Sequence, residues 1–181
     1  MPGPSIRTDI VDVYVFRLPK RAVPATAAPR AARPEFLQVH RATGALSGTW
    51  QPVMGHVRDG ETAVEAALRE LGEEAGYALG RGLRALWQLE SPNTYFLASH
   101  DCMMLSPCLA ALVDPGREPA LNGEHDQYRW VPRDHADRAF LWPGQRAAIE
   151  QVVRDLLPSV LGTEAPAARW LKIDLGGDGG A

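Results

Sequence analysis

The sequence predicts an α+β fold in which helices flank a mixed β-sheet. Residues 10–16 alternate apolar side chains with polar or aromatic ones, a pattern typical of a β-strand. Residues 62–75 contain no proline and are rich in alanine, glutamate, leucine and arginine, which predicts a helix. Further strands and helices follow these two segments without a βαβ rhythm, and this mixture favours α+β.

The elements before the helix are predicted to be short. We expect extended segments at 36–40 and 50–53, with a turn-rich loop at 41–48 between them. Prolines interrupt residues 19–34, which are otherwise mostly alanine and arginine and show no hydrophobic periodicity. We therefore predict a flexible Pro/Ala-rich surface loop at 19–34.

The helix at 62–75 is predicted to stop at Gly76, since glycine readily adopts the left-handed conformation that ends helices. Extended runs are then expected at 86–90, 94–98, 103–113 and 128–131. A second helix is expected from Pro143 to about Leu157, with Pro158 ending it. We expect one domain over residues 1–181, with a disordered tail from about residue 176.

Composition excludes several classes of partner. The chain has 181 residues, with 19 basic against 22 acidic side chains and a net charge of −3. This balance predicts neither a nucleic-acid nor an anionic-membrane partner. Residues 102–113 form a stretch without charges that is too short to cross a bilayer, and the first residues do not resemble a signal peptide. We therefore expect a cytoplasmic protein.

The two cysteines are expected to be free and partly buried. Cys102 and Cys108 lie six residues apart in a segment that reads as one strand, which would separate them by roughly 20 Å. A disulfide requires Cα atoms within about 7 Å of each other. The sequence offers no second pair of ligands at a spacing typical of a zinc site.

Three carboxylates of the predicted helix share one face within a single turn, namely Glu70, Glu73 and Glu74. A separate apolar stripe can pack on a sheet, and it comprises Val64, Ala67, Leu68, Leu71 and Ala75. Like charges at this spacing repel one another, and the helix dipole disfavours anions near the C-terminus. Two interpretations stay open on geometry alone: a solvated acidic face, or a site for a hard cation such as Mg²⁺ or Mn²⁺.

A resemblance to a known family bears on this choice. The pattern Gly55-x5-Glu61-x7-Arg69-Glu70-Leu71-x-Glu73-Glu74-x-Gly76-Tyr77 resembles a complete Nudix box, the signature of the Nudix hydrolases. Tyr77 stands where the family usually has an aliphatic residue. Trp50 precedes the first box glycine by five residues, as in many members, although the common Pro-Gly-Gly entry is missing. Glu124 resembles a further glutamate that many members carry before a late strand.

The resemblance implies an α/β/α sandwich that hydrolyses a nucleoside diphosphate linked to another moiety, with Mg²⁺ as cofactor and Mn²⁺ as a substitute. The implied metal ligands are Gly55, through its carbonyl group, and Glu70, Glu73, Glu74 and Glu124. The implied catalytic residues are Glu73, Glu74 and Glu124, with either Glu74 or Glu124 as the general base. Glu61 and Arg69 are expected to form a supporting salt bridge. Family members are often dimers, so a homodimer is one expected state.

Substrate recognition is predicted less sharply. Arg41 and Arg69 are the candidate ligand-binding arginines, Arg41 for a substrate phosphate and Arg69 beside Glu73. Each aromatic residue that could stack on a base could instead belong to the core, and the set is Trp87, Tyr95, Phe96, Trp130 and Trp142. His125 and His135 are expected at the rim of the site.

Several substrate classes and two other functions stay open. A narrower similarity to dihydroneopterin triphosphate pyrophosphatases covers Trp50-Gln51, Glu124-His125 and residues 142–151. Canonical nucleotides, dinucleoside polyphosphates and nucleotide sugars are the other candidate substrates. A catalytically silent, nucleotide-sensing Nudix-like module is the alternative function. A pure interaction domain, in which the acidic helix face binds a partner, is the third.

Overall fold

The computed structural model describes residues 3–19, 33–44 and 46–176. The predicted loop at 19–34 lies outside these residues except at its two ends, and so does the tail beyond 176. The strands are β1 (Ser5–Arg7), β2 (Ile10–Arg17), β3 (Glu35–Arg41), β4 (Trp50–Gln51), β5 (Val53–His56), β6 (Ala78–Leu79), β7 (Gly82–Gln88), β8 (Asn93–Leu97), β9 (Cys102–Ser106), β10 (Cys108–Val113) and β11 (His125–Pro132). The α-helices are α1 (Ala63–Ala75), α2 (Ala136–Ala139), α3 (Pro143–Gln151), α4 (Leu157–Val160) and α5 (Pro166–Leu171).

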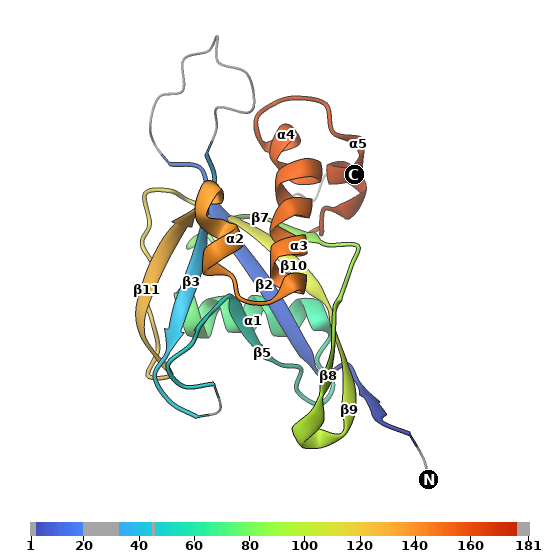
Figure 1. The fold of residues 1–181 in the computed structure, drawn as a ribbon. Helices are drawn as coiled ribbons and strands as arrows, with labels where there is room; N and C mark the ends of the chain where they lie inside the picture. The colour runs from blue at the N-terminus through green and yellow to red at the C-terminus, as the bar shows by residue number, and fades with distance from the viewer. Residues whose placement is uncertain (1–2, 20–32, 45, 177–181) are drawn as a thin grey trace.

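A large mixed sheet forms the centre of the molecule (Figure 1). Its strand order is β11-β3-β2-β10-β7-β6, while β4 pairs with β3 and β5 pairs with β2. Strands β2 and β10 are parallel, whereas β10 is antiparallel to β7 and β3 is antiparallel to β2 and β11. The predicted α+β architecture, a mixed sheet flanked by helices, is therefore confirmed.

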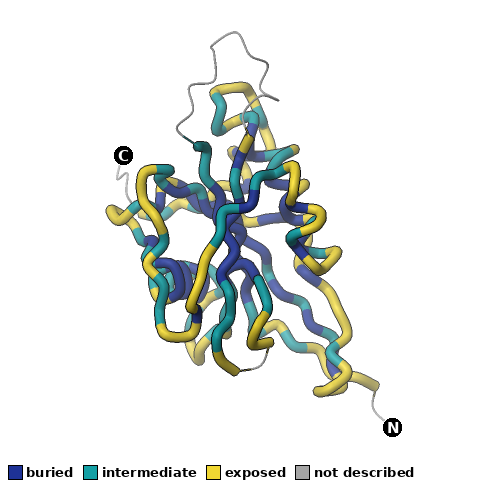
Figure 2. Tube along the Cα trace, turned by 60° about the vertical axis from the view of Figure 1, so that its left-hand side comes forward, coloured by how far each residue is buried: buried dark blue, intermediate teal, exposed yellow. Residues whose placement is uncertain are grey.

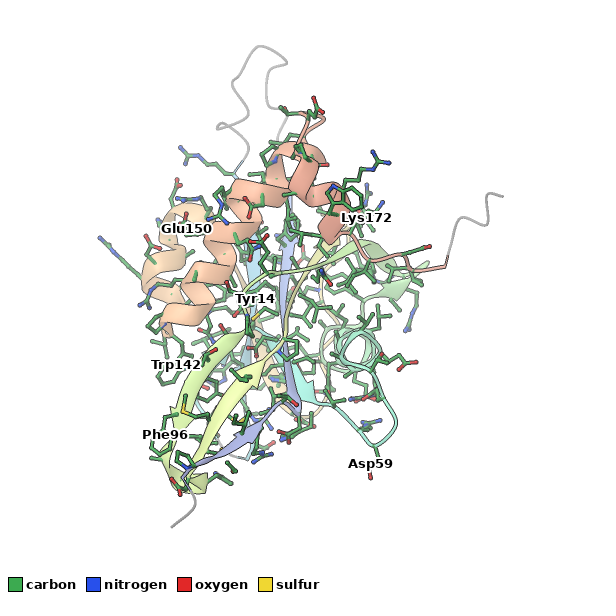
Figure 3. All side chains as sticks on the ribbon, turned by 90° about the vertical axis from the view of Figure 1, so that its right-hand side faces the viewer. Tyr14, Asp59, Phe96, Trp142, Glu150 and Lys172 are labelled. Atoms are coloured by element: carbon green, nitrogen blue, oxygen red, sulfur yellow. The ribbon has the colours of Figure 1, made fainter. Side chains whose placement is uncertain are left out.

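The central strand β2 divides the core into two layers. Val11, Val13 and Val15 belong to the layer under α1, whereas Tyr14 and Phe16 belong to the layer under α3. These five side chains are at most 1% exposed, because successive residues of a strand point to opposite faces and both faces are covered. Figure 3 shows α1 end on at one side of the sheet and the C-terminal helices at the other, and Figure 2 shows the buried trace through the middle.

The second sheet is small and has the order β1-β9-β8. The single extended run predicted at 103–113 is wrong, because β9 belongs to this small sheet and β10 to the large one. Pro107 separates them, and proline has no N–H group with which to continue a strand ladder. Cys102 and Cys108 are free and buried as predicted, although they lie in different strands.

The C-terminal helix also differs from its prediction. It does not stop before Pro158 but continues through a π-helical turn at Val152–Leu156 into α4. Pro158 lies in the first turn of α4, directly after the π-helical turn. No helix in the described part of the chain is long and apolar enough to cross a bilayer.

Candidate active site

Helix α1 is stabilised at both ends, and this fixes the carboxylates that it carries. Thr62 caps the N-terminus: its side chain accepts a hydrogen bond from the Glu65 N–H, and its own N–H donates to the Glu65 carboxylate. Gly76 ends the helix with φ 73°, and its N–H donates to the Gly72 and Leu71 carbonyl oxygens. The predicted helix and its glycine stop are therefore confirmed.

The three carboxylates of α1 are not equally exposed. Glu70 and Glu74 are buried, with 9% and 2% of their surface exposed, whereas the Glu73 side chain is 46% exposed. The helix therefore tilts this acidic face into the protein rather than presenting all of it to solvent. Because Glu70 and Glu74 are buried, the solvated-face interpretation does not describe this helix.

Gly55 of β5 forms a close contact with Glu70. A Cβ atom built on Gly55 would overlap the Glu70 carboxylate, so only glycine leaves this space free. Burial raises the pKa of Glu70, while the adjacent Arg69 guanidinium opposes that rise. The structure thus brings the first glycine of the segment 55–77 directly against one of the predicted metal ligands.

Glu74 is the most deeply buried of the predicted ligands. Its Oε2 atom accepts a hydrogen bond from the Met54 N–H at 3.2 Å, which fixes the carboxylate against β5. Burial raises the pKa of Glu74 to about 8, and the charges of Glu70 and Glu124 add to this rise. Its environment therefore favours either a proton or a cation at this carboxylate.

The Glu61–Arg69 salt bridge is present as expected. Arg69 Nε and Nη2 donate to the two carboxylate oxygens of Glu61 at 2.8 and 2.9 Å, and Nη2 also donates to the His56 carbonyl oxygen. Arg69 Nη1 lies 2.6 Å from Glu70 Oε1 and 3.4 Å from Glu73 Oε2. Arg69 therefore joins the loop before α1 to the carboxylates and supports them. These contacts do not test the prediction that Arg69 binds a ligand.

Arg58 is a neighbour of the site that the sequence did not predict. Its Nη2 atom lies 3.3 Å from Glu73 Oε2, and both side chains are largely exposed, so this ion pair contributes little to stability. Arg58 also donates its backbone N–H to Glu61. Asp59, labelled in Figure 3, marks this loop on the α1 side of the sheet.

Glu124 and Arg41 lie together at the end of the β3–β11 pair. Arg41 Nη2 is 3.3 Å from Glu124 Oε2, and the Glu124 side chain is 55% exposed. The Ala42 N–H donates to the Glu124 carbonyl oxygen, which holds the two loops side by side. Arg41, predicted to bind phosphate, therefore forms an ion pair with a predicted metal ligand.

His125 is buried, so its predicted place at the rim is wrong, whereas His135 is exposed. His125 Nε2 lies 3.8 Å from Glu74 Oε1 and 3.4 Å from Gln51 Nε2. Burial lowers the pKa of His125, and Nδ1 faces the Asn122 Oδ1 acceptor. Gln51 is also buried, and its Oε1 atom has no hydrogen-bond partner in the described part of the chain.

The aromatic candidates separate into two groups. Trp87 is buried and donates its indole N–H to the Ala168 carbonyl oxygen, so it belongs to the core. Trp130 donates to Glu118 and lies against Arg17. The exposed candidates are Tyr95, Phe96 and Trp142, and Figure 3 shows Phe96 and Trp142 on the side of the sheet away from α1.

The donor set fits a hard divalent cation in its chemistry. It comprises only oxygen atoms, from Glu70, Glu73, Glu74 and Glu124 and from the carbonyl of Gly55. Over residues 3–19, 33–44 and 46–176, no three His, Cys, Asp or Glu side chains are grouped closely enough to hold an ion as they stand. Arginines instead contact Glu70, Glu73 and Glu124, so these carboxylates would exchange an arginine for the cation.

Comparisons with known proteins identify relatives of this chain. The Nudix domain family model matches residues 20–152. Asymmetrical bis(5'-nucleosyl)-tetraphosphatases from Sus scrofa and Rattus norvegicus are 29% identical over 127 residues and 31% identical over 117 residues, and each match covers 65% of this chain and 77% of the relative.

Solved structures show the same fold at low sequence identity. An Ap4A hydrolase from C. elegans, in a binary complex, superposes with a TM-score of 0.61 at 19% identity, covering 86% of this chain and 98% of that one. The dihydroneopterin triphosphate pyrophosphohydrolase of E. coli superposes with a TM-score of 0.52 at 24% identity, covering 81% and 98%.

Proposed function

This chain belongs to the Nudix family and is a hydrolase of phosphoric anhydride bonds, and from that premise we propose that it is an Mg²⁺-dependent pyrophosphohydrolase. The observation that carries the proposal is the contact between Gly55 and Glu70, because it brings the first residue of the box segment against one of its acidic residues. Buried Glu74 beside them supports a cation site, since a cation would offset the cost of burying these carboxylates.

We propose a dinucleoside polyphosphate as the leading substrate. The support is the similarity to the mammalian tetraphosphatases, whose matches cover 77% of their length. Dihydroneopterin triphosphate is the second substrate to test. It ranks below the dinucleoside polyphosphate because the likeness to its pyrophosphohydrolase, at 24% identity, supports the shared fold alone. Both compounds contain linked phosphates, which suit oxygen-ligated cations.

Each residue of the site has a role in this proposal. A divalent cation, when bound, neutralises charge on the diphosphate oxygens and makes a water molecule more acidic. Glu70, Glu73 and Glu74 and the Gly55 carbonyl group would hold cations, and Glu124 would complete the set. Glu74 and Glu124 are the two candidate acceptors of the proton from the attacking water, and removing the true base would cost about 10²- to 10⁴-fold in rate. Arg41 would leave Glu124 to bind a phosphate oxygen.

The test is a substrate panel with Mg²⁺. Purified protein is incubated with a dinucleoside tetraphosphate, dihydroneopterin triphosphate, nucleoside triphosphates and a nucleotide sugar, and the products are separated by anion-exchange chromatography. Glu73→Gln is expected to abolish nearly all turnover while circular dichroism stays unchanged, because Glu73 is half-exposed and outside the core. Nucleotide binding without turnover by the wild type would support the nucleotide-sensing alternative.

We also propose a cytoplasmic location and a homodimer as the state to test. The free, buried thiols of Cys102 and Cys108 support a reducing compartment. Fractionation of cells that produce the tagged chain tests the location, and size-exclusion chromatography with light scattering tests the dimer.

A further inference from the structure

We propose that Arg129, held over the ring of Trp50, is a subsite for a substrate phosphate that lies beyond the diphosphate at the carboxylates. This inference rests on the proposed function, because it concerns the length of the phosphate chain that the enzyme selects. It assigns a role to two residues outside the segment 55–77, on the face of the sheet opposite α1.

Arg129 is held in place by two contacts. Its Nε atom donates to Gln38 Oε1 at 2.8 Å, and the buried Gln38 side chain is itself anchored through its Nε2 atom to the Ala139 carbonyl oxygen at 3.1 Å. The guanidinium carbon lies 4.3 Å from the centre of the Trp50 ring. A planar guanidinium that is fixed in this way can bind an anion with little loss of side-chain entropy.

Among the described residues, no carboxylate forms an ion pair with Arg129, although most of the other described arginines have such a partner. Nine of them form ion pairs with Asp or Glu, namely Arg7, Arg17, Arg33, Arg41, Arg58, Arg69, Arg84, Arg133 and Arg154. In the described part of the chain, only Gln38 and Trp50 contact the Arg129 guanidinium group. Burial lowers the pKa of Arg129.

Asp126 carries a carboxylate close to Arg129 and Trp50, and it already has a partner. The centre of the His40 ring lies 5.0 Å from that of the Trp50 ring, with the two planes tilted by 53°, and His40 Nδ1 lies 2.6 Å from Asp126 Oδ1. Asp126 is therefore held by His40, and Arg129 keeps two terminal nitrogens for a ligand. Phosphate is the anion that matches both the charge and the forked geometry of a guanidinium group.

Strand β4 connects the Arg129–Trp50 pair to the carboxylate site. Trp50 contacts Arg129, while the next residue, Gln51, reaches His125, whose Nε2 atom is 3.8 Å from Glu74. Successive side chains of a strand point to opposite faces, so the two sites lie on either side of one strand. Trp50 pairs with His40, and the residue after His40 is Arg41, which contacts Glu124. Both sites therefore lie at the same end of the sheet.

This arrangement predicts selection by the length of the phosphate chain. A diphosphate spanning the carboxylates leaves Arg129 unused, whereas a longer chain can pass the end of β4 and reach it. Since the contact is made outside the reacting bond, it strengthens substrate binding more than it accelerates the chemical step.

The experiment measures kcat and KM for two substrates, a dinucleoside tetraphosphate and the corresponding dinucleoside diphosphate. Arg129→Gln is expected to raise KM for the tetraphosphate by about 10- to 100-fold, the loss typical of one charge-assisted contact, with kcat nearly unchanged. KM for the diphosphate should not change. Arg129→Lys should recover part of the loss, because it keeps the charge without the planar fork.

Arg84→Gln is the matched control, since Arg84 is an exposed arginine on β7 paired with Asp114. It should change neither substrate's KM. An equal effect of Arg129→Gln on the two substrates would overturn the subsite, and so would a normal KM for the tetraphosphate. If Arg129→Gln does not fold, the same comparison is made with Arg129→Lys. A KM for the tetraphosphate that is unchanged in Arg129→Lys, or that changes equally for both substrates, would then overturn the proposal.

A binding measurement separates this inference from the proposed function. Inorganic tripolyphosphate is titrated into metal-free protein and tryptophan fluorescence is recorded, with Trp50→Phe expected to remove the signal and Arg129→Gln expected to weaken binding at least tenfold. A wild type that hydrolyses no substrate of the panel with Mg²⁺ contradicts the proposed function, and this titration then decides the subsite alone. Tripolyphosphate binding that is unaffected by Arg129→Gln overturns the subsite even if the enzyme is active.

Discussion

The carboxylate of Glu70 fills the space in which any side chain at Gly55 would begin, so a strand and a helix meet at this point without a Cβ atom between them. The contact joins the first residue of the Nudix box to one of its acidic residues. It also accounts for the buried position of Glu70, which no spacing along α1 would reveal by itself.

Gly55→Ala should displace the Glu70 carboxylate and reduce turnover by about 10²-fold, because small displacements of catalytic groups are that costly. The overlap should also lower the free energy of unfolding by about 1–3 kcal/mol. Steady-state assays and urea denaturation measure the two effects.

Gly72→Ala is the control for that variant. Gly72 lies inside α1, where a Cβ would meet only the Tyr77 carbonyl oxygen at 3.9 Å. Alanine should therefore stabilise the helix by about 0.5–1 kcal/mol and leave turnover intact. Full activity in Gly55→Ala would contradict the importance of the Gly55–Glu70 contact.

The Glu61–Arg69 salt bridge should govern how the Glu61 carboxyl titrates with acid. Arg69, together with the Arg58 backbone N–H, lowers the pKa of Glu61 to about 2. Because the folded pKa is lowered, the stability from this pair is present above the ordinary value of 4.5 and is lost as pH falls through about 2. Arg69→Gln should move the titration of Glu61, followed by carbon NMR, back toward its ordinary range. An unchanged Glu61 titration would show that Arg69 is not its partner.

For Asp12 we expect the opposite dependence of stability on pH. Burial raises its pKa to about 6 from 3.8, and the Asn93 amide, which donates to both Asp12 and Tyr14, only partly offsets this. Because the folded pKa is raised, the stability is complete below 3.8 and is lost as pH rises through about 6. Asp12→Asn should therefore be more stable than wild type at pH 7, by up to about 3 kcal/mol, and nearly equal to it near pH 4.

Urea denaturation between about pH 4 and 7 measures the Asp12 effect. Asp9→Asn is the control, because the Arg7 side chain lowers the pKa of Asp9 and its removal should instead destabilise the protein at neutral pH. A stability difference between wild type and Asp12→Asn that does not vary with pH would contradict the assigned titration.

Much of α1 could be predicted from the sequence because its signals are local. A run of helix-forming residues, Thr62 at the start and Gly76 at the end are sufficient to define it, and the structure agrees to one residue. The prolines indicated the ends of helices and strands less reliably. Pro158 was expected to end a helix but lies in the first turn of α4, while Pro107, which was not expected to break a strand, separates two sheets.

The surroundings of the carboxylates could not be predicted in the same way, since they depend on tertiary packing. The sequence places His125 at the rim, yet the side chain is buried between Gln51 of β4 and Glu74 of α1. Arg129 and Trp50 are 79 residues apart in the sequence, and no local pattern links them. Their contact follows from the pairing of β3 with both β4 and β11.

We propose that Glu70 and Glu73 exchange their arginine partners for a divalent cation that buried Glu74 also binds. Electron paramagnetic resonance measures this directly, because Mn²⁺ loses its free-ion signal when a protein binds it. The wild type should remove the signal saturably and Mg²⁺ should restore it, whereas a variant with Glu70, Glu73 and Glu74 all changed to glutamine should leave the signal unaltered. Saturable binding of equal affinity in that variant, or none in the wild type, would contradict the cation site.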